Sequence, residues 1–254
     1  MPSTIRVDVA GRIATITLDR PDVRNAIGQQ MIDELHAALS DLEKRDDVHA
    51  LVLTGAGGKA FASGADIAEL RDRRKADALK SINGALFSRV ERFPRPTVAA
   101  IVGFALGGGC ELALACDFRI AGSSSKFGQP EVTLGIVAGA GGLRRLPALV
   151  GLAQARRLLF SGTVIDAAEA LRIGLVDRVV SDDAVPAAVS ELLAPILAAA
   201  PEAVRLTKAS LVARAHGASD EHLALLDREA QAILFEHPDK FARMDAFLAK
   251  RKKP

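Results

Sequence analysis

The sequence contains no tryptophan, no tyrosine and only two cysteines in 254 residues. Nucleic acid bases stack on aromatic side chains, so the missing residue types weigh against a surface that binds single strands. Cys110 and Cys116 are six positions apart, which excludes a disulfide scaffold, a four-cysteine zinc site and a C-x-x-C redox motif. Two such cysteines fit a reducing compartment, and we expect the protein in the cytoplasm.

Neither sign of charge is in excess, and long hydrophobic runs are absent. The chain has 33 Lys and Arg against 31 Asp and Glu, so its net charge of +2 calls for neither nucleic acid nor an anionic membrane. The longest uncharged run, residues 96–110, contains four glycines and is shorter than the ~20 apolar residues of a membrane helix. We therefore expect no membrane span, and the strand-like start of the chain predicts no export or organelle signal.

The remaining composition, 49% hydrophobic and 25% charged, is typical of a globular protein with one large domain, or one domain and an appendage. The five histidines have no metal-ligand spacing, so no metal site is expected. Residues 55–60 loosely match G-x-G-x-x-A, but the residues that follow break the helix that a dinucleotide would need. No G-x-S-x-G motif supports a serine hydrolase.

Hydrophobic periodicity predicts a layered α/β core. Alternation at residues 5–9 and 13–18 predicts a hairpin around Gly11, helical spacing follows at 29–42, and 49–53 is typical of a buried strand. Further along, the patterns predict a helix in at least two pieces at 66–93 and another buried strand at 97–102.

The pattern changes beyond residue 181 to consecutive helices without strands. We expect these helices at residues 184–200, 201–216, 219–235 and 238–250, punctuated by Pro201, Gly217 and Pro238. Such a run predicts a separate layer or arm. We place the boundary near residue 195, which gives a region of residues 1–195 and a region of residues 196–254.

Two glutamates stand alone in long uncharged stretches. Glu111 is the one charged residue within 96–116, and Glu131 is the one charged residue within 127–143. Burial raises the pKa of a carboxyl group from about 4.3 toward neutrality, where it can exchange protons. Two such groups facing one cavity can divide acid and base roles. The alternative is that each glutamate lies at a turn and reaches solvent or an internal hydrogen bond.

Glycine-rich turns accompany these glutamates. Residues 107–109 are three glycines directly before Glu111, and residues 63–66 (SGAD) open a helix after an earlier strand. Both segments offer unpaired backbone N–H groups, which can bind an oxygen that gains negative charge during a reaction. The alternative is simple tight turning, for which glycine is the usual residue.

Several of these segments together resemble the crotonase superfamily, the enoyl-CoA hydratases and isomerases. The resemblance runs from about residue 9 to the C-terminus. Its blocks are Arg20-Pro21 with Asn25-Ala26, residues 61–67 (FASGADI), residues 103–112 (GFALGGGCEL) with Cys116-Asp117, and residues 127–131 (FGQPE) leading to 139–142 (GAGG).

The resemblance implies a fold and an assembly. The fold is an α/β spiral of strand–strand–helix turns, with residues 1–195 as the catalytic core. Residues 196–254 are implied to form a helical oligomerisation region. The implied assembly is a homotrimer or a dimer of trimers.

The resemblance also implies a reaction, the reversible addition of water to the 2,3-double bond of an enoyl-CoA to give a 3-hydroxyacyl-CoA, as in fatty acid beta-oxidation. By the family pattern, the Ala65 and Gly108 N–H groups form an oxyanion hole for the thioester oxygen. Glu111 matches the base that activates water, and Glu131 matches the acid that protonates C2. This hydro-lyase chemistry implies no metal and no redox cofactor, since coenzyme A is part of the substrate.

Further substrate contacts follow from the family pattern. A basic C-terminal stretch of a neighbouring subunit, residues 250–253 here, is implied near the 3′-phosphate of CoA. The implied substrate-binding residues are Arg24, Ala26, Ala62, Ala65, Asp66, Ile67, Ala68 and Gly108.

The chain departs from the pattern at two places, Val137-Ala138 where hydratases commonly have Ile-Pro, and Ala242-Arg243 where a Glu-Gly pair is usual. The first departure removes a rigid proline beside the second glutamate. It leaves open another reaction of the superfamily, 3,2-enoyl-CoA isomerisation. The sequence is also compatible with a non-catalytic acyl-CoA binder, or with an RNA binder that uses the basic residues 71–75. It does not specify the acyl chain length.

Overall fold

A computed structural model describes residues 2–251 of the chain. The chain divides into two compact units, Met1–Leu193 and Ala194–Pro254. The first unit contains two β-sheets with their helices, and the candidate site lies within this unit. The division falls within α8 (Val185–Ala198), close to residue 195.

The first unit begins with the predicted hairpin. Strands β1 (Ile5–Ala10) and β2 (Ile13–Leu18) pair antiparallel, and Gly11 between them adopts a φ of 58° that favours glycine. Every second residue of β2, from Ala14 to Leu18, is buried. This alternation fixes which face of the hairpin packs on the core, because a shift by one residue would expose the apolar set.

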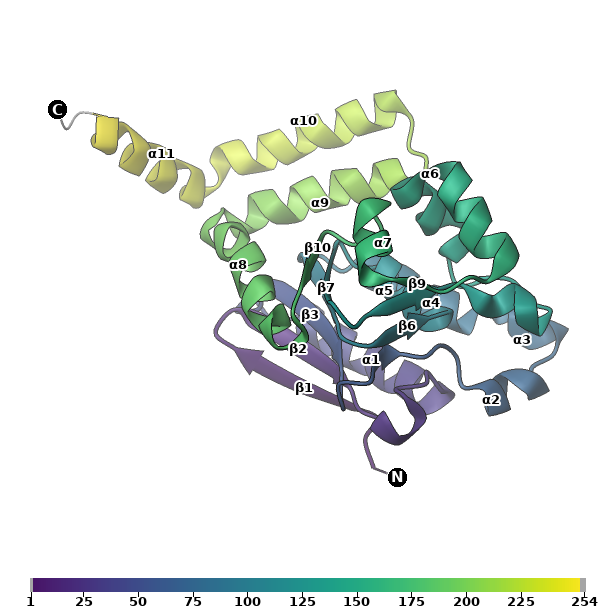
Figure 1. The fold of residues 1–254 in the computed structure, drawn as a ribbon. Coiled ribbons are helices and arrows are strands. Elements are labelled where there is room, and N and C mark those ends of the chain that lie inside the picture. The colour runs from purple at the N-terminus through teal and green to yellow at the C-terminus, as the bar shows by residue number, and fades with distance from the viewer. Residues whose placement is uncertain (1, 252–254) are drawn as a thin grey trace. The chain divides into compact units, whose positions relative to one another are not determined.

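The chain then winds as a spiral in which successive strand pairs contribute one strand to each of two sheets, as the resemblance implied (Figure 1). The large sheet has the order β1-β2-β3-β5-β7-β10, and the small sheet has the order β4-β6-β8-β9. Every neighbouring pair from β2 onward in the large sheet is parallel. The strands are β3 (Ala50–Gly55), β4 (Ala60–Ala62), β5 (Thr97–Ile101), β6 (Phe104–Leu106), β7 (Phe118–Gly122), β8 (Lys126–Gly128), β9 (Ile165–Asp166) and β10 (Arg178–Val180).

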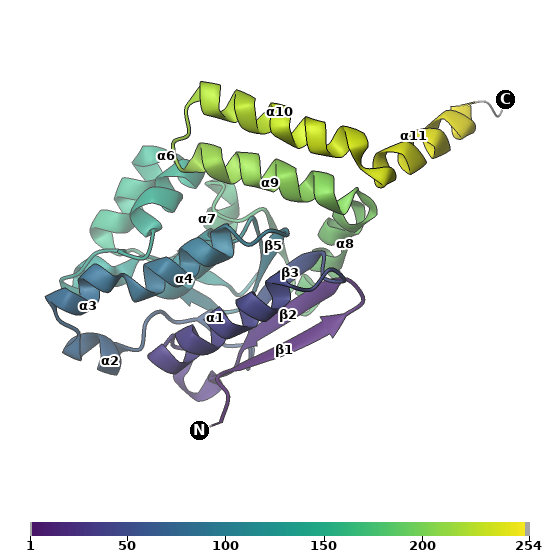
Figure 2. The same ribbon diagram turned by 180° about the vertical axis from the view of Figure 1, so that it is seen from behind.

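Helices α1 (Gln29–Glu43) and α4 (Ile82–Glu91) lie side by side against the large sheet (Figure 2). Each buries an apolar stripe, with Leu35 and Leu39 in α1 and Phe87 in α4 at 1% exposure or less. The predicted helical segment 66–93 consists of three helices, because the chain leaves the helical conformation at Arg73, with a ψ of 144°, and at Ser81, with a φ of 47°. The other two are α2 (Ile67–Asp72) and α3 (Lys75–Lys80).

Short connections and longer helices complete the first unit. The elements that bear on the site are the 3-10 helix η2 (Pro130–Leu134), α5 (Gly108–Leu114) and α6 (Gly142–Ser161). The rest are the 3-10 helices η1 (Pro21–Val23) and η3 (Asp182–Ala184), and helix α7 (Ala167–Arg172).

The second unit is helical, as predicted. Helices α9 (Pro201–Ala215) and α10 (Asp220–Glu236) run side by side, and α11 (Pro238–Arg251) continues from α10 (Figure 1). Arg243 of α11 donates to the carbonyl oxygens of Ala198 and Ala199 at 2.8 and 3.2 Å. Within residues 2–251 no single helix is long and apolar enough to cross a membrane, although two consecutive helices, 182–198 and 201–215, reach the length and composition together.

Candidate active site

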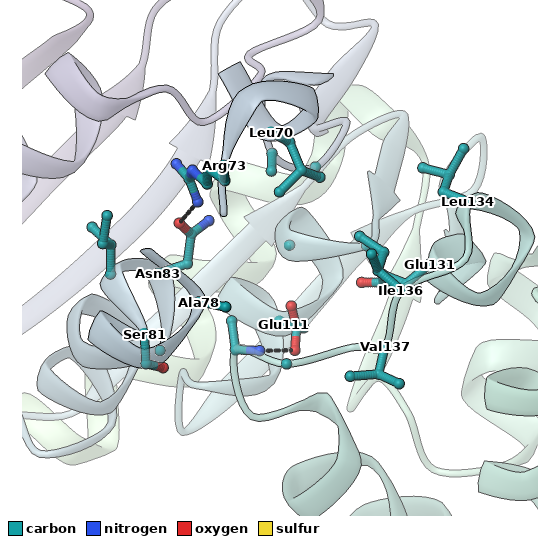
Figure 3. Close-up of a pocket in the computed structure, with 18 of the residues that line it drawn as sticks. Leu70, Arg73, Ala78, Ser81, Asn83, Glu111, Glu131, Leu134, Ile136 and Val137 are labelled. Carbon is teal, nitrogen blue, oxygen red and sulfur yellow. Dashed lines mark hydrogen bonds between the residues drawn. The ribbon is translucent and has the colours of Figure 1, made fainter. Parts of the chain in front are cut away.

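A cavity of about 740 Å³ lies in the first unit, between the start of α5, the η2 turn and helices α2 to α4 (Figure 3). Its wall is mostly apolar. At one side, the Arg73 guanidinium donates to Asn83 Oδ1 at 3.2 Å, and both residues line the cavity. Its apolar side chains include Leu70, Ile82, Leu134, Ile136 and Val137.

The two glutamates that stand alone in the sequence meet at this cavity. Glu111 lies on α5 and Glu131 on η2, and both side chains line the cavity and point into it (Figure 3). Both are buried, with 3% and 8% of their surface exposed. The two glutamates thus line one cavity, and neither reaches bulk solvent. The internal hydrogen bonds of the alternative interpretation are present as well, because Glu111 Oε1 accepts from two main-chain N–H groups.

One oxygen of Glu111 is held by the main chain. The N–H groups of Ala140 and Gly142 donate to Glu111 Oε1 at 2.7 and 2.8 Å. Burial raises the pKa of Glu111 above its usual value, while these two donors and the positive charge of Arg145 offset part of the rise. The Oε2 oxygen accepts no hydrogen bond within residues 2–251, which leaves it for a ligand.

Glu131 has a different environment. Burial raises its pKa from 4.5 to about 7, and the negative charge of Glu111 adds to the rise, while the Glu131 N–H lowers it. The side-chain amide of the buried Gln129 lies 3.0 and 3.1 Å from the two carboxylate oxygens, and its nitrogen is the end that can donate to them. At neutral pH, Glu131 is therefore divided between its protonated and ionised forms.

Two backbone donors adjoin the carboxylates. Ala65 precedes α2 and Gly108 is the first residue of α5, and both line the cavity. A Cβ built on Gly108 would lie 3.4 Å from the Ala65 nitrogen, so the two groups are close neighbours. Neither N–H has an acceptor within residues 2–251. The first N–H groups of a helix lack intrahelical partners, which makes this pair suited to an oxygen that becomes negative.

The three glycines at 107–109 allow the start of α5 to lie close to the neighbouring segments, in addition to forming a tight turn. A Cβ on Gly109 would lie 2.0 Å from the carbonyl oxygen of Ala62 in β4, so only glycine lets α5 pack this closely. Gly107 has a φ of 50°, and a Cβ there would lie 3.2 Å from Glu131 Oε1. The triplet thus brings the start of α5 against both the Ala65 segment and Glu131.

Of the other predicted substrate-binding residues, one lines the cavity and five lie outside its lining. Ile67 lines the cavity with Ala65 and Gly108. The remaining five lie outside the cavity lining, and their contact with substrate stays a prediction. They are Arg24, Ala26, Ala62, Asp66 and Ala68.

Four of the five residues outside the lining, all except Ala62, take part in hydrogen bonds, an ion pair or a ring contact. Asp66 accepts from the Ala68 N–H at 3.2 Å, which caps α2, and it pairs with Arg20 at 3.2 Å. The same arginine donates to the Ala26 carbonyl oxygen at 2.8 Å. The Arg24 guanidinium lies 5.6 Å from the centre of the Phe104 ring.

The sequence did not single out several residues of this site. Asn83 lines the cavity beside Arg73 of the predicted basic segment 71–75, while Gln129 and Arg145 support the two glutamates from behind. Gln129 had one available signal, because it is a polar side chain two positions from Glu131 in an uncharged stretch. Arg145 follows Arg144 in the sequence, and nothing there indicates that one of the two is buried.

A match to a protein-family model identifies the family of this chain. The family model described as enoyl-CoA hydratase/isomerase matches residues 8–254. The chain belongs to the enoyl-CoA hydratase/isomerase family. The family resemblance carried by the sequence blocks is thereby confirmed.

Relatives within the enoyl-CoA hydratase/isomerase family match over nearly the whole chain. The short-chain-enoyl-CoA hydratase of Clostridium acetobutylicum is 39% identical over 252 residues, which cover 98% of this chain and 96% of the relative. The crotonyl-CoA hydratase of Syntrophomonas wolfei is 40% identical over 243 residues, covering 95% and 93%. The crystal structure of the Bacillus anthracis enoyl-CoA hydratase has a TM-score of 0.91 at 35% identity, covering 97% and 96%.

Two departures from the family pattern have a place in the structure. Val137 is exposed and lines the cavity, whereas Ala138 is buried beside Gly142. Arg243 binds Asp239 and two main-chain carbonyls of the second unit.

Of the basic stretch expected near the 3′-phosphate, residues 252 and 253 lie outside the described residues. Within residues 2–251, no group of three His, Cys, Asp or Glu side chains is arranged to hold a metal ion.

Proposed function

We propose that this protein is an enoyl-CoA hydratase that adds water reversibly to the 2,3-double bond of a short-chain enoyl-CoA and forms the 3-hydroxyacyl-CoA. One observation carries the proposal: two buried carboxyl groups, Glu111 and Glu131, line a single cavity beside two backbone N–H groups that have no acceptor in residues 2–251. The names of the relatives from Clostridium acetobutylicum and Syntrophomonas wolfei support the short acyl chain and its first member, crotonyl-CoA.

The proposed reaction begins at the thioester. The Ala65 and Gly108 N–H groups bind the carbonyl oxygen and stabilise the negative charge that develops on it as C3 is attacked. Loss of one such donor typically costs about 10² to 10³ in rate. Because polarisation of the carbonyl draws electrons from the conjugated double bond, C3 becomes the electrophilic carbon.

Water then adds with two proton transfers. Glu111 Oε2 removes a proton from water while the water oxygen bonds to C3, and protonated Glu131 delivers its proton to C2. The hydration consumes no net proton, because the proton gained by Glu111 equals the one lost by Glu131. The two donors on Glu111 Oε1 favour its ionised form, and the pKa of about 7 keeps a share of Glu131 protonated.

Other parts of the prediction follow from this chemistry. The reaction transfers only water and protons, so it requires no metal and no redox cofactor. We place its enoyl-CoA substrate in fatty acid beta-oxidation. Arg73, Arg74 and Lys75 line the cavity, and we assign them to the negatively charged CoA rather than to RNA. Both cysteines are buried and form no disulfide with each other, and the cytoplasm is the proposed location.

The proposed assembly is a homotrimer or a dimer of trimers, with residues 196–254 as the oligomerisation region. Light scattering tests it, since the mass should be three or six times that of the 26.7 kDa chain. A monomeric mass would contradict this part and leave the proposed reaction standing.

The direct test follows the ultraviolet absorbance of the enoyl thioester with crotonyl-CoA and with longer enoyl-CoAs. We expect loss of absorbance, fastest with the short chain. A folded preparation without turnover on any chain length would contradict the hydratase. A 3-enoyl-CoA that is converted to the 2-enoyl isomer without hydration would favour the isomerase instead. Calorimetric affinity for acyl-CoA without any turnover would favour the non-catalytic binder.

A further inference from the structure

Arg145 is a buried charge behind the candidate active site. It lies on α6, its guanidinium is 4% exposed, and it does not line the cavity. Its Nη2 pairs with Glu91 Oε2 of α4 at 2.8 Å. Burial alone would raise the pKa of Glu91, but hydrogen bonds from Arg145 and Arg144 outweigh it and lower the pKa to about 2. At neutral pH the half-buried Glu91 carboxylate is therefore ionised and pairs with the buried Arg145 guanidinium.

The other end of the guanidinium holds a turn of the main chain. Arg145 Nη1 donates to the carbonyl oxygen of Ala140 at 3.0 Å. It packs so closely on the turn that a Cβ on Gly141 would lie 2.1 Å from this nitrogen. Gly141 also has a φ of 111°, a backbone conformation that favours glycine. The Arg145 guanidinium occupies the space that a side chain at this position would need.

The same turn carries the two N–H groups that hold Glu111. Ala140 accepts from Arg145 through its carbonyl and donates to Glu111 Oε1 through its N–H, and Gly142 supplies the second donor. A chain of contacts thus runs from Glu91 through Arg145 and the turn 140–142 to Glu111. It fixes Oε1 and directs Oε2 away from the main chain.

Core stability alone does not account for an arginine here. Its Nε is buried and has no hydrogen-bond partner within residues 2–251. An unpaired buried donor costs free energy, and a buried ion pair can often be replaced by apolar residues without loss of stability. The arrangement instead matches support for a catalytic group, whose orientation must hold within about 0.5 Å.

We propose that Arg145, clamped by Glu91, is a positioning residue for the hydration: it fixes the turn 140–142 so that Glu111 presents Oε2 to the attacking water. This inference rests on the proposed role of Glu111 as the base. The charged groups of the described residues that face Glu111 are Arg145 on α6 and Glu131 on η2. Arg145 touches neither the cavity nor the substrate position, so it acts through the turn.

The test compares four variants in crotonyl-CoA hydration. Arg145→Lys keeps the charge but replaces the two guanidinium nitrogens that contact Ala140 and Glu91 by a single ammonium nitrogen. Arg145→Gln removes the charge, and Glu91→Gln removes the clamp. A misplaced catalytic group can cost about 10²-fold in rate, so we expect kcat to fall about 10- to 100-fold with KM changed by less than about 3-fold. Arg144→Ala is the matched control and should retain wild-type kcat, because Arg144 pairs with the same Glu91 oxygen, whereas the guanidinium that donates to the Ala140 carbonyl is that of Arg145.

Two further readouts separate positioning from general stability. In Arg145→Gln, the low-pH limb of kcat/KM should move to higher pH, because loss of a nearby positive charge raises the pKa of Glu111, whereas Arg145→Lys should leave the limb in place. In a Glu111→Gln background, Arg145→Lys should cause no further loss, because its effect passes through Glu111. An equal loss in that background would overturn the proposal.

The outcomes also separate this proposal from the proposed function. An active wild type beside fully active Arg145→Lys and Glu91→Gln variants would overturn the positioning role alone. A wild type without hydratase activity would overturn the proposed function and, with it, the role of Arg145. Should Arg145→Gln not fold, Arg145→Lys and Glu91→Gln still give the decisive comparison, with circular dichroism confirming their folds.

Discussion

Gly109 of α5 faces the carbonyl oxygen of Ala62 in β4 so closely that a Cβ would lie 2.0 Å from that oxygen. This contact fixes the start of α5 against the small sheet, next to the segment that carries Ala65. The Ala65 and Gly108 N–H groups belong to these two segments. The distance between the segments therefore depends on the absence of a side chain at Gly109.

We expect Gly109→Ala to destabilise the fold, because the added methyl group meets backbone rather than a flexible side chain. Overpacking of this kind typically costs about 1–3 kcal/mol, which urea unfolding would measure. Gly139→Ala is the control, since a Cβ there would have its nearest contact at 3.7 Å. Equal stability of Gly109→Ala and Gly139→Ala would refute the close-approach argument.

The raised pKa of Glu131 predicts how stability depends on pH. Burial holds this pKa at about 7 in the folded protein against 4.5 for the exposed group. The folded state therefore binds the proton more tightly, and the free energy of unfolding falls as pH rises from about 4.5 through 7. Glu131→Gln cannot ionise, so at pH 8 it should exceed the wild type by on the order of 3 kcal/mol.

Urea unfolding at pH 4 and pH 8 measures this effect, and the gain from Glu131→Gln should disappear near pH 4. Glu91→Gln is the control of opposite sign, because the pKa of Glu91 is lowered to about 2 and its ionised form stabilises the fold above about pH 4.5. It should lose stability at pH 8. If both variants moved the same way between the two pH values, the assigned environments would be wrong.

The coupled glutamates also predict the pH dependence of the rate. Both directions of the reaction use the pair with one proton on it, on Glu131 for hydration and on Glu111 for dehydration. We expect kcat/KM for hydration to fall as pH rises through about 7, where Glu131 loses its proton. Dehydration should follow the same profile, because no net proton is consumed. A rate that is flat from pH 6 to 9 would argue against Glu131 as the acid.

Asp66 predicts a local effect on stability. Its side chain caps α2 and pairs with Arg20, which ties the chain before α1 to the segment after Ala65. Loss of a helix N-cap costs about 0.5–2 kcal/mol, so Asp66→Ala should lower the melting temperature. Asp66→Asn keeps the cap and should lose less. Calorimetry that ranks the asparagine variant below the alanine variant would contradict the capping role.

Much of this fold could be predicted because its signals are local. The alternation in residues 5–18 and the helical run after residue 181 depend on neighbouring positions, and both predictions were confirmed. The two breaks in the helical segment 66–93 could not be placed from the sequence, because they fall at Arg73 and Ser81 and not at a glycine or proline.

The candidate site was predictable only in part. Glu111 and Glu131 stand out because their sequence neighbours carry no charge, which is itself a sign of burial. Arg145 gives no such sign, since its burial depends on α4, which lies more than 50 residues earlier in the chain. Which of Arg144 and Arg145 turns inward is decided by helix geometry and by the shape of the turn at Gly141, and neither can be read from composition.

The most direct test of the account measures crotonyl-CoA hydration by the wild type, by Glu111→Gln, by Glu131→Gln and by the double variant, all at equal folded concentration. Each single change should lower kcat by about 10² to 10⁴, with acyl-CoA still bound. The double variant should lose far less than the product of the two single losses, because the residues act as one unit. Wild-type turnover by either single variant would contradict the claim that the two carboxyl groups carry out the addition of water together.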